Sequence, residues 1–219
     1  MATAGAAVNP ADYDAWYDST RGRWIGDTEY LLLLALLAPR PDARLLDVGC
    51  GTGWFTRRFA RLPGLDVVGA DINDESLTFA RRRDQDTSYV HADALALPFA
   101  ASSFDYVVSV AALGFISDWP RAMAEMVRVA RERVVVGVLN RHSVLWWEKG
   151  RHGGSGGYRG VYWHAAYELR RALVGCGLRH VRIRSAVFLP NGSGAAYLLE
   201  QCVPDAVLYG AFLVGVGEK

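Results

Sequence analysis

Short apolar runs alternate with helical patterns through much of the chain. The runs have the length of buried strands and lie at 43–49, 65–71, 87–93, 104–113 and 133–140. Helical spacing or helix-capping residues mark the segments between them, at 54–62, 73–83 and 118–130. Strands that alternate with helices form right-handed βαβ units. The pattern therefore predicts an α/β fold with a mostly parallel sheet covered on both faces.

This regularity ends after residue 140. Residues 141–164 mix aromatic and basic residues around "GGSGG", which indicates a loop or lid. A helix is predicted at 165–176. Two late apolar runs follow at 179–189 and 206–217, and their proximity predicts an antiparallel pair at the edge of the sheet.

Composition narrows the class of protein. A chain of 219 residues with a formal net charge of +1 fits one ordinary domain and does not indicate a nucleic-acid partner. The cysteines, Cys50, Cys176 and Cys202, are widely spaced, which favours reduced thiols over disulfides or a zinc site. The longest apolar run, 31–38, is too short to span a membrane, and the first residues lack a signal-peptide pattern. We therefore expect a soluble cytoplasmic protein without a metal.

The stretch "LLDVGCGTGWF" at 45–55 carries the clearest chemical signal. Gly49, Gly51 and Gly53 follow the first apolar run, and Asp47 precedes them. Glycines in such a turn let the backbone approach a ligand closely and point amides at it. A dinucleotide motif would need a third glycine where Trp54 stands, which argues against a nicotinamide-dependent oxidoreductase.

Acids at the ends of the next strands add to this signal, because ligands of parallel sheets bind at the carboxyl ends of strands. Asp71 closes the second predicted strand, where a carboxylate can accept both hydroxyls of a ribose. Asp93 closes the third, where its carboxylate and the amide of Ala94 can bind the edge of an adenine. The alternative for each acid is structural: Asp71 as a helix cap, and Asp93 as the cap of the following turn.

Four motifs in this order and spacing, "LLDVGCGTG", "VVGADIN", "HADALALPF" and "FDYVVSVAALGFI", resemble class I S-adenosylmethionine-dependent methyltransferases of the small-molecule branch. The resemblance covers 43–140, and 13–33 is similar to the family's N-terminal helix, which folds over the cofactor. It implies a three-layer αβα Rossmann-like sandwich whose seven-stranded sheet has six parallel strands and an antiparallel last strand. We then expect a single domain over 1–219. Its parts are a helical cover (1–40), a cofactor-binding core (43–140), an acceptor-side lid (141–164) and a C-terminal helix with edge strands (165–219).

The resemblance also assigns cofactor contacts. Asp47 and the backbone of the loop would hold the methionine end of S-adenosylmethionine, with Asp71 on the ribose. The remaining contacts would come from Gly49, Cys50, Gly51 and Gly53 in the loop, Ile72, Asp93 and Ala94 around adenine, Val110 beside the methyl group, and Tyr13 and Trp16 as cover. For the Cys50 thiol we favour a small buried filler over a nucleophile.

The acceptor side is less defined. Many relatives carry a histidine at the end of the fourth strand, where this chain has Leu113, and the asparagine-proline-proline-aromatic motif of methyltransferases acting on nucleic acid or glutamine is missing. His142 is the first candidate for a base, ahead of His152 and His164, each of which has a structural alternative. The surrounding aromatic residues form either an acceptor pocket or core: Trp146, Trp147, Tyr158, Tyr162 and Trp163.

The sequence therefore predicts an enzyme that transfers a methyl group by in-line displacement to a small-molecule acceptor, with S-adenosylhomocysteine as product. The alternatives are a relative that binds the cofactor without turnover, an RNA or protein methyltransferase, and a nicotinamide-dependent oxidoreductase. The acceptor, the atom methylated, the need for a base, and the choice between monomer and homodimer stay open.

Overall fold

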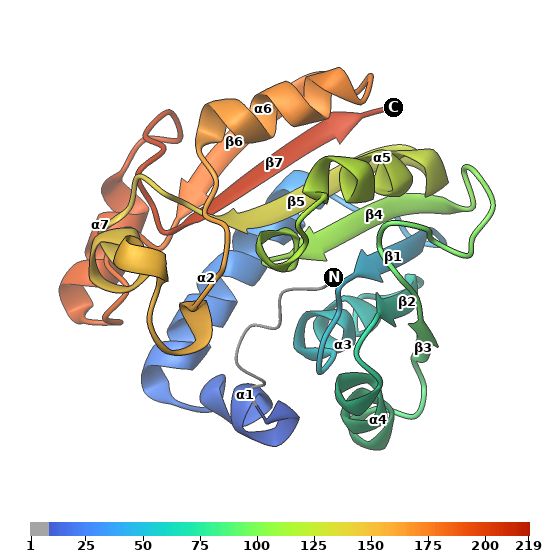
Figure 1. The fold of residues 1–219 in the computed structure, drawn as a ribbon, viewed down its shortest axis with the longest axis horizontal. Coiled ribbons are helices and arrows are strands. Elements are labelled where there is room, and N and C mark those ends of the chain that lie inside the picture. Colours follow the sequence, from blue (N-terminus) through green and yellow to red (C-terminus); the bar gives the residue numbers. More distant parts are fainter. Residues whose placement is uncertain (1–8) are drawn as a thin grey trace.

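The computed structural model describes residues 9–219, which form one seven-stranded sheet with helices on both faces (Figure 1). The strands are β1 (Arg44–Val48), β2 (Asp66–Asp71), β3 (Ser88–His91), β4 (Phe104–Val110), β5 (Ala130–Leu139), β6 (Arg179–Ala186) and β7 (Phe212–Glu218). Their order in the sheet is β3-β2-β1-β4-β5-β7-β6. Six strands run in one direction, and β7, which lies between β5 and β6, runs in the opposite direction. The predicted fold class is confirmed.

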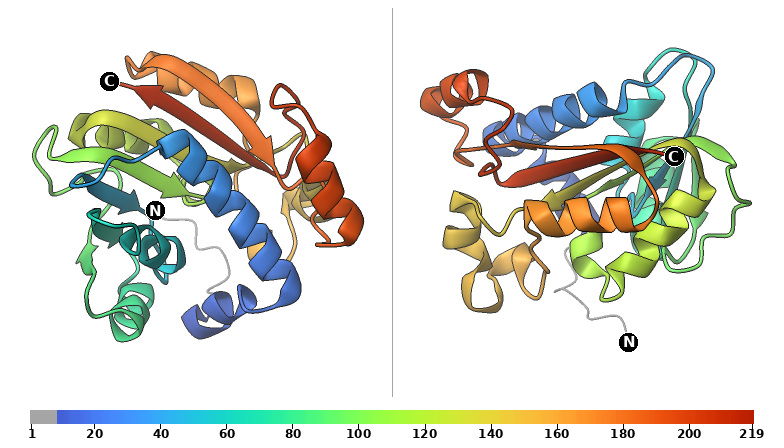
Figure 2. Two further views of the ribbon diagram at one scale, coloured as in Figure 1. Left: turned by 180° about the vertical axis from the view of Figure 1, so that it is seen from behind. Right: turned by 90° about the horizontal axis from the view of Figure 1, so that it is seen from above.

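Helices make the outer layers, as Figure 2 shows from above. They are α1 (Pro10–Trp16), α2 (Thr20–Leu37), α3 (Trp54–Ala60), α4 (Asp74–Arg83), α5 (Trp119–Val129), α6 (Ala166–Gly175) and α7 (Gly194–Cys202). One apolar cluster joins α2 and α3 to the sheet, and a second joins α5 and α6 to the opposite face. Because β1 and β4 contribute to both clusters, they are buried on both sides, which explains their continuous apolar runs.

The segment 13–33, expected as one helix, contains parts of two helices, α1 and α2, which are joined by a short turn at 17–19. Ser19 begins α2 as its N-cap: its Oγ accepts a hydrogen bond from the N–H of Gly22 and donates one to the carbonyl of Trp16. A Cβ at Gly22 would overlap that same carbonyl, so the close approach of the two helices requires glycine there. Residues 1–8 of the predicted cover lie outside the described residues.

The C-terminal region differs from expectation in its boundaries. The strand predicted at 206–217 begins only at Phe212, the one predicted at 179–189 ends at Ala186, and α7 lies between them. The reason is a side chain: buried Asn140 donates from Nδ2 to the carbonyls of Leu208 (3.0 Å) and Gly210 (2.7 Å). Because these carbonyls accept hydrogen bonds from a side chain and not from a neighbouring strand, β7 begins only after them.

The segment 141–164 contains short helical turns rather than a plain loop. Trp146–Gly150 forms a π-helical turn, and Arg151–Gly153 and Gly156–Tyr158 form 3₁₀ turns. In Figure 1 this segment (gold) lies on the side toward which the arrowheads of β4 and β5 point. No helix within 9–219 is long and apolar enough to cross a membrane.

Candidate functional site

The glycine loop links the ends of β1 and β2. The N–H groups of Gly49 and Cys50 donate to the carbonyl of Ala70 at 2.7 and 3.1 Å. All three glycines have positive φ, 76° at Gly49, 52° at Gly51 and 77° at Gly53, which favours glycine. The turn between β1 and α3 is therefore held to the neighbouring strand by backbone hydrogen bonds.

The three glycines have different reasons to lack a side chain. A Cβ at Gly49 would overlap the Ala112 side chain, and one at Gly53 would lie 2.6 Å from the Tyr89 hydroxyl. A Cβ at Gly51 would meet no atom within 4 Å. Internal packing accounts for the outer two glycines, whereas Gly51 faces open space where a ligand can approach.

Asp71 organises this loop. Its Oδ2 accepts the N–H of Gly51 at 2.7 Å, and its Oδ1 accepts the N–H of Asn73 at 2.8 Å. The cap of α4 is Asn73, which accepts the N–H of Ser76, so Asp71 is not the helix cap; its structural role is instead to hold the backbone of the loop. Each carboxylate oxygen has a further lone pair that can accept a ribose hydroxyl.

Asp47 is buried with one oxygen unsatisfied. Its Oδ2 accepts a hydrogen bond from the Thr56 hydroxyl at 2.7 Å, and its Oδ1 has no hydrogen-bond partner. Burial raises the pKa of Asp47 to about 7; the Thr56 bond opposes this, and the negative charge of Asp71 adds to it. An ammonium group, such as the one on the methionine end of S-adenosylmethionine, would compensate the buried carboxylate. The residues present therefore fit the predicted cofactor.

The predicted adenine contacts lie beside Asp71. Ile72 follows it directly and is 58% exposed, unusual for a large apolar side chain beside a strand end. The exposed Asp93 accepts the N–H of Leu95 at 2.9 Å, so the turn cap expected as its alternative is present. Adenine binding by Ile72, Asp93 and the half-buried Ala94 stays a prediction.

The end of β4 contacts the glycine loop. Val110, its last residue, is half-buried and packs against the α2–α3 cluster. Ala111 follows with φ 56°, an uncommon conformation for a residue with a Cβ, and its N–H donates to Gly137 at 2.8 Å. Leu113, at the position where the resemblance led us to look for a histidine, is fully buried. Val110 therefore lies at the strand end nearest the loop, as its predicted role requires.

Cys50 points away from the open side of the loop. Its thiol lies in the small cluster formed by Leu77, Ala80 and Tyr89. Burial raises the pKa of this thiol well above its usual value, so it stays protonated at neutral pH. This position agrees with a filler and leaves only its backbone for a ligand.

The helix α1 is attached to the loop by a buried ion pair. Asp14, 3% exposed, accepts hydrogen bonds from Arg57 at 2.7 Å and Arg83 at 3.3 Å. Arg57 also donates to the carbonyl of Thr52, a residue of the glycine loop, at 2.6 Å. This arrangement connects the predicted cover to α3, α4 and the loop itself.

Aromatic rings line the same junction. Tyr17 stacks on Trp54 with ring centroids 4.1 Å apart, so the residue in the third-glycine position has a packing role. Tyr13 and Trp16 on α1 keep 42% and 36% of their surface exposed. They are therefore free to contact a ligand, as predicted for a cover.

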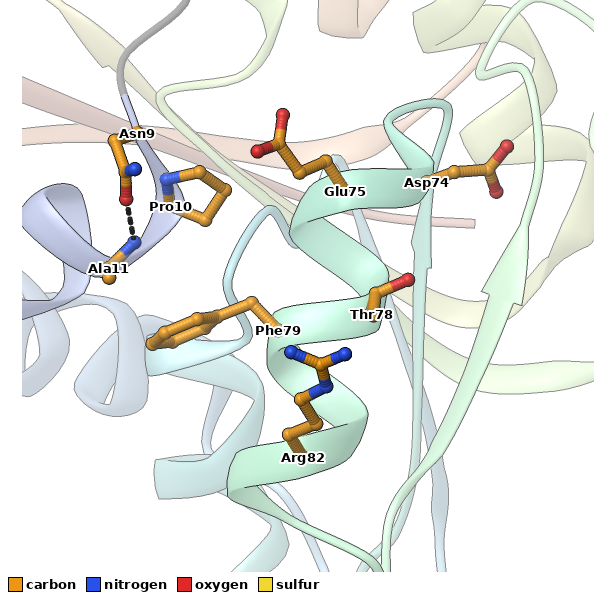
Figure 3. Close-up of a pocket in the computed structure, with 8 residues that line it drawn as sticks. All are labelled: Asn9, Pro10, Ala11, Asp74, Glu75, Thr78, Phe79 and Arg82. Atoms are coloured by element: carbon orange, nitrogen blue, oxygen red, sulfur yellow. Dashed lines mark hydrogen bonds between the residues drawn. The ribbon is translucent and has the colours of Figure 1, made fainter.

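A separate groove lies between the start of α1 and α4 (Figure 3). It is lined by Asn9, Pro10, Ala11, Asp74, Glu75, Thr78, Phe79 and Arg82. None of the predicted site residues lines it, so it is distinct from the glycine loop.

The three candidate histidines have different surroundings. His142 and His152 are exposed. His164 is fully buried, neither ring nitrogen has a hydrogen-bond partner, and its ring packs on Trp119 and Tyr162. Burial lowers the pKa of His164 to about 4, which keeps it neutral. His142 therefore remains the accessible candidate, and its role stays a prediction.

The aromatic residues of the lid segment divide between core and surface. Trp163 is buried, and Trp146 and Tyr158 are half-buried against the cluster that contains Tyr17. Trp147 and Tyr162 are largely exposed. The core reading therefore holds for Trp163, and an acceptor pocket formed by the others stays a prediction.

Sequence reasoning missed Thr56, the Asp14–Arg57 pair and Glu29. Glu29 is half-buried on α2, four residues after buried Ile25 and four before buried Leu33. A helical projection of 20–37 would have placed this acid on the apolar face. The partners of Thr56 and Asp14 depend on tertiary contacts that no local pattern encodes.

Comparison with known proteins identifies the family. A family model described as a methyltransferase domain matches residues 46–136. The chain is 33% identical over 220 residues to a Mycobacterium tuberculosis protein described as uncharacterized, covering 98% of this chain and 73% of that protein. It is 36% identical over 126 residues to a malonyl-[acyl-carrier protein] O-methyltransferase of Erwinia pyrifoliae, covering 54% of this chain and 48% of the relative.

The fold agrees with this result. A S-adenosylmethionine-dependent methyltransferase structure from Thermotoga maritima aligns with a TM-score of 0.78 at 23% identity, covering 95% of each chain. The glycine loop, the strand-end acids and the family match lead to one conclusion. The chain belongs to the class I S-adenosylmethionine-dependent methyltransferases, and S-adenosylmethionine is its cofactor.

Proposed function

We propose that this enzyme methylates a small-molecule acceptor, with the methionine end of the cofactor on the glycine loop at 49–53. The observation that carries this placement is the unsatisfied Oδ1 of buried Asp47 next to a loop in which Gly51 faces open space. When bound, S-adenosylmethionine supplies a methyl group already activated on a sulfonium. The protein's part is to align the acceptor for in-line displacement and to exclude water.

The proposed contacts follow the sequence prediction. Asp47 compensates the ammonium group, Asp71 accepts the ribose hydroxyls, and Val110 lies beside the methyl group. Ile72, Asp93 and Ala94 surround adenine, and Tyr13 and Trp16 cover the cofactor. One relative is named for a small acceptor: a demethylmenaquinone methyltransferase of Renibacterium salmoninarum, 41% identical over 91 residues. This name supports a small acceptor.

Binding of S-adenosylhomocysteine is expected to weaken as the pH falls below 7. The pKa of Asp47 is raised to about 7, and the ligand's ammonium favours the ionised carboxylate. A proton must therefore leave before binding, so the affinity falls by up to about tenfold per pH unit below that pKa. Calorimetric titrations between pH 5.5 and 8.5 measure this. Asp47→Asn should bind weakly with a flat profile, and a flat profile in the unvaried protein contradicts the Asp47 assignment.

Asp14→Asn is expected to loosen α1. The change leaves Arg57 without its buried charged partner, a loss of about 3 kcal/mol. Hydrogen exchange measured by mass spectrometry should accelerate in 10–16 while β1 and β4 stay protected, and binding of S-adenosylhomocysteine should weaken. Unchanged exchange in 10–16 would show that the ion pair does not hold the cover.

The small-molecule assignment is tested with methyl-labelled S-adenosylmethionine and a bacterial extract separated into small-molecule, RNA and protein fractions. We expect label to be transferred into the small-molecule fraction. Label in the RNA or protein fraction would contradict the proposal. Binding of the cofactor without transfer to any fraction would favour the relative without turnover.

A further inference from the structure

Among the buried and half-buried acids of residues 9–219, Glu29 is the one without a hydrogen-bond or ion-pair partner. Within residues 9–219, every other buried or half-buried carboxylate accepts a hydrogen bond or forms an ion pair. These acids are Asp14, Asp27, Asp47, Asp71, Asp84, Asp105, Glu125, Glu132, Glu168, Glu200 and Glu218. No such contact involves Glu29 in that part of the chain. The Glu29 oxygens are not among the partnerless side-chain atoms that are closed to water, so this half-buried carboxylate stays accessible to a ligand.

Its position on α2 places it near the cofactor site. Gly26 lies one turn before Glu29, and a Cβ there would come within 2.6 Å of Trp54 and 2.8 Å of Tyr17. Positions three apart on a helix share a face. Glu29 therefore lies on the face of α2 that packs against the start of α3, directly after the glycine loop.

The charge of Glu29 acts on three tyrosines from different elements. Desolvation raises the pKa of Tyr13, Tyr17 and Tyr158, and the negative charge of Glu29 contributes to each increase. Tyr13 belongs to α1, Tyr17 follows it, and Tyr158 belongs to the lid segment. The charge of Asp71 also acts on Tyr13. Glu29 is thus located where the cover and the lid segment meet, on the side of the ribose-binding acid.

We propose that Glu29 binds the methyl acceptor and that this acceptor is an amine that arrives as a cation. The inference rests on the proposed function, because it gives the acceptor of that same site a chemical class. A carboxylate without a partner, beside electron-rich rings, attracts an ammonium group. It repels a carboxylate acceptor, as do the nearby acids Asp47 and Asp71.

The same residue can take up the proton that methylation of an ammonium requires. The N–H proton passes to a carboxylate oxygen of Glu29, and the freed lone pair forms the new bond to the methyl carbon. The electron pair of the broken carbon–sulfur bond stays on sulfur, and the methylated amine leaves as a cation. Burial raises the pKa of Glu29 to about 8, so the side chain can accept a proton above that pH, or once the positive charge of a bound ammonium favours the ionised form.

This pKa has a consequence for stability. The pKa of Glu29 is higher in the folded than in the unfolded protein. Its contribution to stability is therefore fully present when the pH is below the pKa of the unfolded state, and it is lost as the pH rises toward about 8. The titratable groups facing it are Tyr13, Tyr17 and Tyr158, with Arg21 near Tyr158. Glu29→Gln should therefore raise the Tm at pH 8.5 and leave it nearly unchanged at pH 4.5. If the charge of Glu29 instead stabilised the fold, Glu29→Gln would have a lower Tm at pH 8.5.

The decisive experiment measures binding of two probes with the same aromatic body, phenethylamine and 3-phenylpropionate, to the protein saturated with S-adenosylhomocysteine. We expect phenethylamine to bind more tightly, and Glu29→Gln to weaken it by about tenfold or more while 3-phenylpropionate binds no worse. Glu132→Gln is the matched control, because Glu132 lies near the start of β5 and forms an ion pair with Arg40. It should leave both affinities unchanged.

Three outcomes overturn the inference: tighter binding of 3-phenylpropionate, equal binding of phenethylamine by Glu29→Gln, or no binding of either probe at millimolar concentration. Failure of the unvaried protein to bind S-adenosylhomocysteine is a separate result. It would overturn the proposed cofactor placement as well.

Discussion

Asp71→Ala is expected to weaken binding of S-adenosylhomocysteine by about 100-fold or more, because two kinds of hydrogen bond are lost together. The carboxylate is proposed to accept both ribose hydroxyls, and it accepts the N–H of Gly51 at 2.7 Å. Without it, the ribose loses charge-assisted bonds and the loop loses a contact that fixes its shape. Calorimetric titration at pH 8 measures the change.

Asp66→Ala is the matched control for this prediction. Asp66 begins the same strand at its opposite end and pairs with Arg44 on the surface. Its loss should leave the affinity unchanged. Asp71→Asn keeps an oxygen for the Gly51 N–H while removing the charge, so it should bind better than Asp71→Ala and less well than the unvaried protein. Unchanged affinity in Asp71→Ala would rule out the ribose assignment.

Gly51→Val is expected to abolish measurable binding of the same ligand while the protein stays folded. A Cβ at this position meets no atom of the described protein within 4 Å, so the side chain extends into the space proposed for the methionine end. The φ of 52° makes any side chain there strained, by about 1–2 kcal/mol, which lowers the Tm modestly. Calorimetry reports the binding, and circular dichroism with thermal melting reports the fold.

Gly177→Val separates strain from obstruction. Gly177 also has positive φ, 84°, and a Cβ there also meets no atom within 4 Å, but it lies in the turn between α6 and β6. It should lower the Tm by a similar amount and leave binding intact. Normal binding by folded Gly51→Val would mean that the cofactor does not lie against this part of the loop.

Local pattern was sufficient to predict the sheet. The runs at 43–49, 65–71 and 133–140 correspond to β1, β2 and β5 within a few residues, because strands buried on both faces are apolar throughout. The antiparallel edge pair also follows from pattern and proximity. The late start of β7 was not predictable, since it depends on Asn140, about 70 residues earlier in the chain, binding the carbonyls of Leu208 and Gly210.

The same contrast applies to α7. Its apolar residues do not form a buried face: only Ala196 is buried, while Tyr197 and Leu198 are largely exposed, and glycines lie at its start. Its Ser193 cap is the signal that could have been used, because Ser193 accepts the N–H of Ala196.

For the site, sequence predicted which residues lie at the strand ends but not what each one contacts. The glycine spacing identified Gly49 and Gly51 but could not distinguish their roles. A side chain at Gly49 would overlap Ala112, whereas a Cβ at Gly51 would meet no atom within 4 Å. Asp71 was placed correctly at the end of β2, yet its bond to the loop could not be inferred from spacing. A helical projection could have placed Glu29 on the apolar face of its helix, but the absence of a partner in residues 9–219 is visible only in the three-dimensional structure.

The most direct measurement is calorimetric titration of the purified protein with S-adenosylhomocysteine, with NAD titrated in parallel. We expect one site per chain with micromolar affinity for S-adenosylhomocysteine and no heat of binding for NAD. A folded sample that binds NAD, or that does not bind S-adenosylhomocysteine, would contradict the placement of the cofactor on the loop between β1 and α3.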